Sequence, residues 1–439
     1  MSSYGSISKQ RHRYLVRELV DNRGGDFCPL QSHQELIDQW AFLSSANLHN
    51  HCQDLLKLAA NPALLMIALS QLGRIQVLGE SGTDEFTNQI WAWFRDLGKR
   101  LLGRTFRRGE YHKVQIPKPG KRGFRTIEVP SDETRIVSRN LSNILTPLLD
   151  RSFYPLSIGF RSKRSAMHGL GALDVLLQRG LTHVVACDIK DAFGQLPKQR
   201  ALQILSSRIH NSPVMWLVEE ILDRHRKRGV PQGISISPLM LNVYLDHNLD
   251  HWWVANHQET VLIRYADDIL IACPSRESAI ASYTALRDRI QKIGMEIKET
   301  QDEAVFDLAA GEVVDFLGFR VRLTGDGHMK LSINDTSWEK LEITLAEASH
   351  KLVELGEPVE PYHSARIGFG WLMQKAIAID HAQLSSIAGA IRDRGNFFGL
   401  DMSMLTDKEA EIDWENGQQQ WQKARKDVVG WLPQNGLVH

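Results

Sequence analysis

The sequence predicts an α+β fold, and three features of the chain support this prediction. Residues 181 to about 335 alternate apolar runs of β-forming residues with amphipathic stretches such as 276–294, as expected for a sheet covered by helices. Residues 1–75 carry few strand or turn signals after Pro29 and favour helices. Beyond residue 336, apolar residues recur with helical spacing. We therefore expect a central sheet region between helical segments.

Residues 76–180 are expected to mix helices with a basic β-hairpin. Formal net charge is zero, yet the basic residues between 95 and 125 far outnumber the acidic Asp96 and Glu110. They are Arg95, Lys99, Arg100, Arg104, Arg107, Arg108, Lys113, Lys118, Lys121, Arg122 and Arg125. A solvated helix face would explain scattered lysines better than this cluster. The cluster therefore indicates contact with a phosphate backbone.

The C-terminal region, 336–439, is expected to be helical. Thr336-Ser337-Trp338-Glu339 has the pattern of a capping box. An apolar stripe follows at Trp338, Leu341, Leu345, Ala348, Leu352 and Leu355. Such a stripe indicates a helix that packs against a core. A dimerisation helix has the same pattern, so the sequence is also compatible with a homo-oligomer.

Two neighbouring acids, Asp267 and Asp268, interrupt a strongly apolar hairpin pattern at 261–273. A third acid, Asp188, follows the apolar strand 183–187. Carboxylates in apolar surroundings are costly unless a cation compensates them. If the two strands are neighbours in one sheet, the three acids converge at one edge. Oxygen ligands of this kind suit Mg²⁺, and two such ions form the clamp of polymerases and nucleases.

Across residues 110 to 320, the motifs resemble those of the reverse transcriptases. Tyr265-Ala266-Asp267-Asp268 resembles the third palm motif of that family, and Asp188 with Phe193 resembles the first. The stretch 229–238, Gly-Val-Pro-Gln-Gly-Ile-Ser-Ile-Ser-Pro, resembles the palm motif beneath the incoming nucleotide. Residues 116–125 resemble the basic fingers hairpin. The order of these motifs along the chain is that of the family.

The resemblance implies a right-hand polymerase. Its parts would be a helical N-terminal extension (1–75), fingers (76–180), a palm with an antiparallel sheet and helices (181–335), and a helical thumb-like region (336–439). The implied activity is RNA-directed DNA polymerisation by two-metal phosphoryl transfer. The implied cofactor is Mg²⁺, two ions, for which Mn²⁺ can substitute. The implied partners are an RNA template, a DNA or RNA primer and deoxynucleotides.

The resemblance also assigns roles to single residues. The catalytic acids would be Asp188, Asp267 and Asp268, with the backbone carbonyl of Ile189 as a further metal ligand. Nucleotide contacts would come from Lys118, Arg125, Phe193, Gln232 and Gly233. Template and primer contacts would come from Gly159, Phe160, Arg161, Ser165, Tyr265 and the primer-grip residues Phe316, Leu317 and Gly318.

The fourth palm motif departs from the family pattern. Met295-Glu296-Ile297 resembles this motif, but the position of the family's lysine, which can protonate the leaving pyrophosphate, falls on Gln301. Lys298 lies three residues too early. We therefore expect Lys298 to be a solvated lysine without a catalytic role.

The sequence carries less information about cellular context. Cys28, Cys52, Cys187 and Cys273 have no CxxC spacing, which indicates a reducing compartment. The first 19 residues lack the apolar core of a signal peptide, and no apolar run is long enough for a bilayer. We expect a cytoplasmic protein without a membrane partner. The preferred template is a companion non-coding RNA in antiphage defence. Alternatives are an intron-type or CRISPR-associated reverse transcriptase, or an RNA-binding maturase with secondary polymerase activity.

Overall fold

The computed structural model describes residues 4–6, 55–72, 76–78, 84–117, 123–210, 212–355 and 361–432. The chain divides into two compact units. Unit 1 comprises residues 1–116, 126–154 and 191–249, and unit 2 comprises residues 117–125, 155–190 and 250–439. None of the described helices is long and apolar enough to cross a membrane.

Unit 1 is mainly helical. Its helices are α4 (Leu55–Ala59), α5 (Pro62–Gln71), α6 (Asp84–Leu102), α7 (Asp132–Asp150), α9 (Ala192–Gln195), α10 (Lys198–Ile209), α11 (Ser212–Ile221) and α12 (Ser237–Leu245). Helix α5 begins where Asn61 Oδ1 accepts a hydrogen bond from the Ala63 N–H at 2.9 Å, with Pro62 in the first turn. Both residue types favour a helix start. Helices α4 and α5 pack against α7, and the Asn140 amide of α7 donates to the Ala59 carbonyl.

Two pairs of strands accompany these helices. Strand β1 (Tyr4–Ser6) pairs antiparallel with β2 (Gln76–Leu78). The expectation of an entirely helical segment over 1–75 is therefore wrong at residues 4–6, and residues 7–54 lie outside the described part. Strands β3 (His112–Pro117) and β4 (Phe124–Val129) form a two-stranded sheet at the position of the expected basic hairpin.

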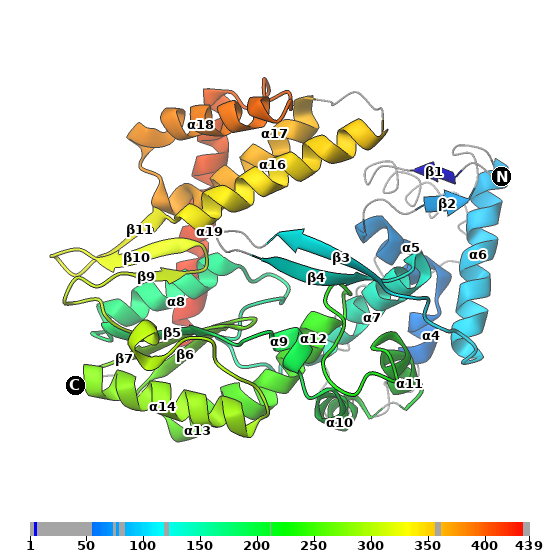
Figure 1. The fold of residues 1–439 in the computed structure, drawn as a ribbon, viewed down its shortest axis with the longest axis horizontal. Coiled ribbons are helices and arrows are strands. Elements are labelled where there is room, and N and C mark those ends of the chain that lie inside the picture. The colour runs from blue at the N-terminus through cyan, green and yellow to red at the C-terminus, as the bar shows by residue number, and fades with distance from the viewer. Residues whose placement is uncertain are drawn as a thin grey trace. The chain divides into compact units, whose positions relative to one another are not determined.

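Unit 2 contains a four-stranded antiparallel sheet in the order β6-β7-β5-β8. These strands are β5 (His183–Asp188), β6 (Val261–Tyr265), β7 (Asp268–Cys273) and β8 (Val305–Asp307). Residues 269–273 of β7 are all buried, so both faces of this strand must be covered. Helix α14 (Arg276–Lys292) packs against β5 and β7, and α8 (Ala166–Gln178) packs against β6 and β7 (Figure 1). A short helix, α13 (His251–Asn256), precedes β6.

A second sheet of unit 2 has the order β11-β10-β9 and leads into the C-terminal helices. Its strands are β9 (Val314–Phe316), β10 (Phe319–Leu323) and β11 (Met329–Ile333). The helices are α16 (Asp335–Leu355), α17 (Pro361–Lys375), α18 (Leu384–Phe397) and α19 (Asp407–Val429). Leu341 and Leu345 are buried in a core shared by α16, α17 and α18. The predicted stripe is therefore confirmed at these positions.

The start of α16 differs from the prediction. The helix begins at Asp335, and Asn334 Oδ1 accepts from the Ser337 N–H at 3.0 Å. The capping residue is thus Asn334 and the expected box at 336–339 is wrong, because an asparagine side chain caps a helix as well as a hydroxyl does. The predicted α+β class, with an antiparallel palm-type sheet and a helical C-terminal region, is confirmed.

Candidate active site

The predicted catalytic acids lie at one edge of the four-stranded sheet of unit 2. Strand β5 ends at Asp188, strand β7 begins at Asp268, and the two residues are direct partners in the antiparallel register. Side chains of direct partners lie on the same face of a sheet. Asp267 precedes β7, and its carbonyl accepts from the Ile189 N–H at 2.9 Å. The expectation that the two strands are neighbours is confirmed.

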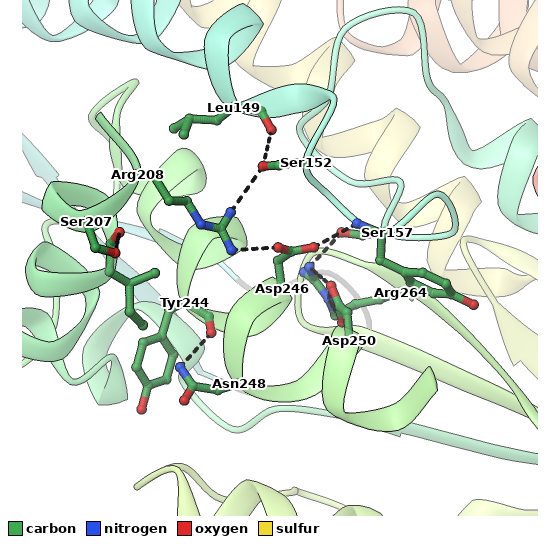
Figure 2. Close-up of polar contacts among 12 residues, drawn as sticks. Leu149, Ser152, Ser157, Ser207, Arg208, Tyr244, Asp246, Asn248, Asp250 and Arg264 are labelled. Atoms are coloured by element: carbon green, nitrogen blue, oxygen red, sulfur yellow. Dashed lines mark hydrogen bonds and ion pairs between the residues drawn. The ribbon is translucent and has the colours of Figure 1, made fainter. Parts of the chain in front are cut away.

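A buried arginine holds the turn that carries Asp267. Ala266 has φ +61°, a backbone conformation that is uncommon outside glycine. The guanidinium of Arg264 donates to the Ala266 carbonyl at 2.9 Å. The same group donates to Ser157 Oγ at 2.6 Å (Figure 2). It also pairs with Asp250 at 2.6 Å, and both side chains are fully buried. Arg264 therefore fixes the backbone of the turn that carries Asp267 from inside unit 2.

Gly159 approaches the same turn at backbone distance. The Ile158 N–H donates to the Arg264 carbonyl at 2.7 Å, so this segment runs alongside β6. A Cβ on Gly159 would lie 2.3 Å from the backbone nitrogen of Ala266. Only glycine fits at such a distance. The structure thus gives Gly159 a packing role beside the template role that the resemblance assigns.

The electrostatics of this edge favour a shared cation. Burial, and then the charges of Asp188 and Asp267, raise the pKa of Asp268 well above its ordinary value. Carboxylates that repel one another in this way gain from a nearby positive charge. Lys298 acts in the opposite direction on the same group. The carboxylate set therefore attracts cations.

Lys298 forms an ion pair that the sequence interpretation missed. Residues 188–190 and 296–298 run antiparallel, with hydrogen bonds from Lys298 N–H to the Asp188 carbonyl and from Lys190 N–H to the Glu296 carbonyl. This brings the Lys298 ammonium into contact with Asp188 Oδ2. Lys298 is exposed, as expected of a solvated lysine, but the register also places it directly beside the acid, a contact that the sequence did not predict. Its lack of a catalytic role stays a prediction. Gln301, at the position of the family's lysine, begins the short helix α15 (Gln301–Ala304).

Glu299 is a further acid at this edge that the motifs did not reveal. Its Oε2 accepts from the Asp188 N–H at 2.8 Å, and its Oε1 lies 3.6 Å from Lys298 Nζ. In the part of the chain that the structure describes, no three His, Cys, Asp or Glu side chains are arranged to hold a metal ion as they stand. The donor chemistry fits Mg²⁺, since every group is a carboxylate oxygen. However, Lys298 occupies one oxygen of Asp188.

The predicted nucleotide-binding residues are only partly described. Lys118 lies outside the described residues, and Arg125 is in β4 with its side chain outside them. Within unit 1, the Phe193 carbonyl accepts from the Val230 N–H at 2.9 Å. The Gln232 carbonyl accepts from the Glu128 N–H of β4 at 2.8 Å. Phe193 is thus hydrogen-bonded to the loop that carries Gln232, and that loop is hydrogen-bonded to β4.

Gly233 has a structural reason to be glycine. Its φ is +121°, and a Cβ would lie 2.6 Å from Ile127 Cγ2. The loop therefore packs tightly on β4.

The predicted template and primer residues belong to unit 2, and they differ in exposure. Phe160 is 49% exposed with φ +60°. Arg161, by contrast, is buried and donates to the Ser157 carbonyl at 2.7 Å. Ser165 caps α8, where its N–H donates to His168 Nδ1. Burial raises the pKa of Tyr265.

The predicted primer-grip residues form a tight turn between β9 and β10. Phe316 ends β9 and is buried. Leu317 and Gly318 have φ of +52° and +81°, and positive φ at both central residues is the mark of a type I′ hairpin turn. A Cβ on Gly169 of α8 would lie 2.7 Å from Leu317 Cδ1. The leucine side chain thus packs toward α8.

Comparison with known proteins gives a family for this arrangement. The model of the family "Reverse transcriptase (RNA-dependent DNA polymerase)" matches residues 116–321. A putative COX1/OXI3 intron 2 protein of Saccharomyces cerevisiae is 24% identical over 216 residues, which are 46% of this chain and 25% of that protein. The group II intron-encoded protein LtrA of Lactococcus lactis subsp. cremoris is 22% identical over 200 residues, 44% of this chain and 31% of LtrA.

One solved structure to which the chain is similar is that of a telomerase from Candida albicans in complex with a fragment of telomeric RNA. Its TM-score is 0.44 at 13% identity, over 82% of this chain and 66% of that one. The chain spans about a third or less of the length of the two sequence relatives above. The matched segment, 116–321, contains the acids, their sheet and every predicted site residue. This segment, which is somewhat less than half of the chain, matches the reverse transcriptase family.

Proposed function

We propose that this chain is an RNA-directed DNA polymerase that extends a primer with deoxynucleotides on an RNA template. One observation carries the proposal. Asp188 lies opposite Asp268 in the sheet, with Asp267 in the adjoining turn, inside the segment that matches the reverse transcriptase family. Fingers, palm and thumb would correspond to residues 76–180, 181–335 and 336–439.

In this proposal, Asp188 and Asp267 would hold divalent ions, with Asp268 and the Ile189 carbonyl in support. When bound, such ions lower the pKa of the primer hydroxyl and stabilise charge on the triphosphate. Two residues of the chain would support this metal site before an ion binds. Arg264 fixes the turn before β7, and Lys298 compensates Asp188 until a stronger cation competes for it.

Residues of the fingers hairpin and of the palm motif at 229–238 would bind the nucleotide. Lys118 and Arg125 would neutralise the triphosphate, with arginine offering two directed donors and lysine a point charge. Gln232 and Gly233 would lie beneath the base pair. Gly159, Phe160, Arg161, Ser165 and Tyr265 would face the template, and Phe316, Leu317 and Gly318 the primer end.

Phe193 is the residue on which sugar choice should depend. A ribonucleotide differs from a deoxynucleotide by one 2′-hydroxyl, and a phenylalanine ring offers that hydroxyl no partner. Clash and an unpaired donor together should cost at least ~1 to 3 kcal/mol. We expect the wild type to extend an RNA-templated primer with deoxynucleotides, and Phe193→Val to accept ribonucleotides as well. Primer-extension assays with each nucleotide set measure this.

The matched control for Phe193 is Phe397→Val, a substitution at an exposed phenylalanine at the end of α18. It should leave sugar choice unchanged. A wild type that incorporates both nucleotide sets equally would contradict the role of Phe193 and point to an RNA polymerase.

The proposal leaves three alternative sources for the RNA template. The preferred source is a companion non-coding RNA used in antiphage defence, which rests on analogy within the family. The intron-encoded relatives favour an intron RNA instead, and a CRISPR-associated enzyme is a third alternative. Sequencing RNA and cDNA that co-purify with the protein distinguishes these sources. Tight RNA binding without any primer extension would favour a maturase.

A further inference from the structure

The Leu317–Gly318 turn has a backbone conformation that needs support. Both residues have positive φ, and for leucine this region is unfavourable. The turn joins only three residues of β9 to five of β10. Strands this short form few hydrogen bonds with each other that could hold the turn. Contacts from elsewhere in unit 2 must therefore hold it.

Lys375, the last residue of α17, reaches the turn from the C-terminal helices. Its ammonium donates to the Gly318 carbonyl at 2.8 Å and lies 4.0 Å from the centre of the Phe319 ring. Ser337 Oγ donates to the same carbonyl at 2.6 Å. A Cβ on Gly318 would lie 2.9 Å from Lys375 Nζ and 3.0 Å from Ser337 Oγ. The two side chains thus close tightly around Gly318.

The surroundings of Lys375 are unusual for a buried cation. The residue is 7% exposed. Among the described residues, no carboxylate pairs with its ammonium, and the charged group that acts on it is another cation, Lys340 of α16. Burial, and then Lys340, lower the pKa of Lys375 to about 8. A buried charge without an acid costs stability, and an apolar side chain of similar length would not.

A residue that costs stability in this way needs a functional reason. Ser337 already supplies a neutral hydrogen bond to the Gly318 carbonyl. A charged donor makes a hydrogen bond about twice as strong as a neutral one. The aromatic ring adds a cation–π contact on the other side. The ammonium therefore fixes the carbonyl more firmly than the hydroxyl can.

We propose that Lys375 is a positioning residue for the primer: it holds the Gly318 carbonyl and so keeps the Leu317–Gly318 turn in the conformation that receives the primer 3′ end. This inference rests on the proposed function, in which that turn contacts the primer. It adds a residue of α17, outside the matched segment, to the determinants of primer binding.

The test compares Lys375→Met with Lys375→Arg, and uses Lys408→Met on the exposed start of α19 as the control. Steady-state primer extension is measured against the concentration of an RNA–DNA primer–template. We expect Lys375→Met to raise the KM for primer–template about ten-fold with a smaller change in kcat. Lys375→Arg should recover part of this loss, and Lys408→Met should match the wild type.

Two readouts separate positioning from a purely structural role. Lys375→Met should unfold at the same temperature as the wild type or higher. In the wild type, KM should rise as the pH passes about 8 and Lys375 loses its charge, whereas the methionine variant should show no such step.

The lowered pKa of Lys375 also predicts how stability depends on pH. Between about pH 8 and the ordinary lysine pKa, the unfolded chain binds more protons than the folded one. The unfolding free energy of the wild type should therefore rise with pH there, relative to Lys375→Met.

Failure of this inference can be told from failure of the proposed function. A folded Lys375→Met with wild-type KM overturns the inference, as does a lower unfolding temperature without the pH step. If Lys375→Met does not fold, Ser337→Ala must raise KM in the same direction, and an unchanged KM overturns the inference. If the wild type extends no primer, the proposed function fails, and fluorescence anisotropy with a labelled primer–template still tests whether Lys375 affects binding.

Discussion

Two tight hairpin turns in unit 2 use a similar device with different chemistry. In the turn between β6 and β7, Arg264 donates to the carbonyl of Ala266 at 2.9 Å, and Ala266 has positive φ. In the turn between β9 and β10, Lys375 donates to the carbonyl of Gly318 at 2.8 Å, and Gly318 has positive φ. Each turn is thus held by a buried cation. Among the described residues, Arg264 pairs with a buried acid, Asp250, whereas Lys375 pairs with none.

Because of this difference, we call the turn between β6 and β7 fixed, since its support should not change with pH, and the turn between β9 and β10 adjustable, since its support should change. A guanidinium stays charged at every pH a protein tolerates, and Arg264 is also paired with the buried Asp250. Lys375 has a carbonyl and a ring in place of an acid, and its pKa is lowered to about 8. We therefore expect the hydrogen bond to the Ala266 carbonyl to be independent of pH, whereas the one to the Gly318 carbonyl should weaken as Lys375 loses its charge above about pH 8.

Breaking the buried ion pair should have the largest effect on stability. Asp250→Asn leaves the charge of Arg264 buried without an acid, which should cost about 3–5 kcal/mol of unfolding free energy. Urea denaturation measures it. The control is Asp288→Asn, whose side chain is 62% exposed and pairs with the neighbouring Arg287, and which should change stability by less than about 1 kcal/mol. Equal effects of the two variants would show that the Arg264 pair does not hold the turn.

Adding one methyl group beside the turn between β6 and β7, and one within the turn between β9 and β10, sharpens the comparison. In Gly159→Ala, the new Cβ would lie 2.3 Å from the backbone nitrogen of Ala266, which cannot move aside. In Gly318→Ala, it would meet the ends of two side chains at 2.9 and 3.0 Å, which can shift. We expect a loss of about 3 kcal/mol for Gly159→Ala and about 1–2 kcal/mol for Gly318→Ala, the latter partly from its positive φ. Urea denaturation should rank them in this order. The reverse order would contradict the fixed and adjustable assignment.

A third cation of unit 2, Lys298, holds a carboxylate and not a carbonyl, and its effect should be the smallest. Because it competes for Asp188, Lys298→Met should bind Mg²⁺ a few-fold more tightly, within the ~0–1 kcal/mol of a partly exposed ion pair. Calorimetric titration with Mg²⁺ measures this. The control is Lys190→Met, since Lys190 pairs with Glu296 at 3.3 Å and not with one of the predicted catalytic acids. Weaker binding by Lys298→Met alone would show that Lys298 supports the metal site.

The sequence predicted the parts of this site that depend on local pattern. The apolar runs before Asp188 and around Asp267 identified two strands and their shared edge, which the register of β5 and β7 confirms. The α+β class followed from the alternation of strands and helices. Both inferences use only the period of apolar residues and the cost of burying acids.

The supports of the site could not be predicted in the same way. Lys375 reaches Gly318 across 57 residues of sequence, and no local pattern marks such a contact. The contact of Lys298 with Asp188 was missed because it follows from a bridge between segments about 110 residues apart. Arg264 did leave a signal, a lone charge within the apolar run 261–265. A buried arginine almost always has an acid partner, so this position could have been found.

The central claim is that the acids at the edge of β5 and β7 carry RNA-templated DNA synthesis. Single-turnover extension of a primer by one deoxynucleotide on an RNA template, with Mg²⁺ at saturation, tests it most directly. The wild type and Asp288→Ala should extend the primer equally fast. Asp267→Ala should fold normally and extend none, because it lacks a carboxylate that would hold the metal. Extension by Asp267→Ala at the wild-type rate would contradict the account.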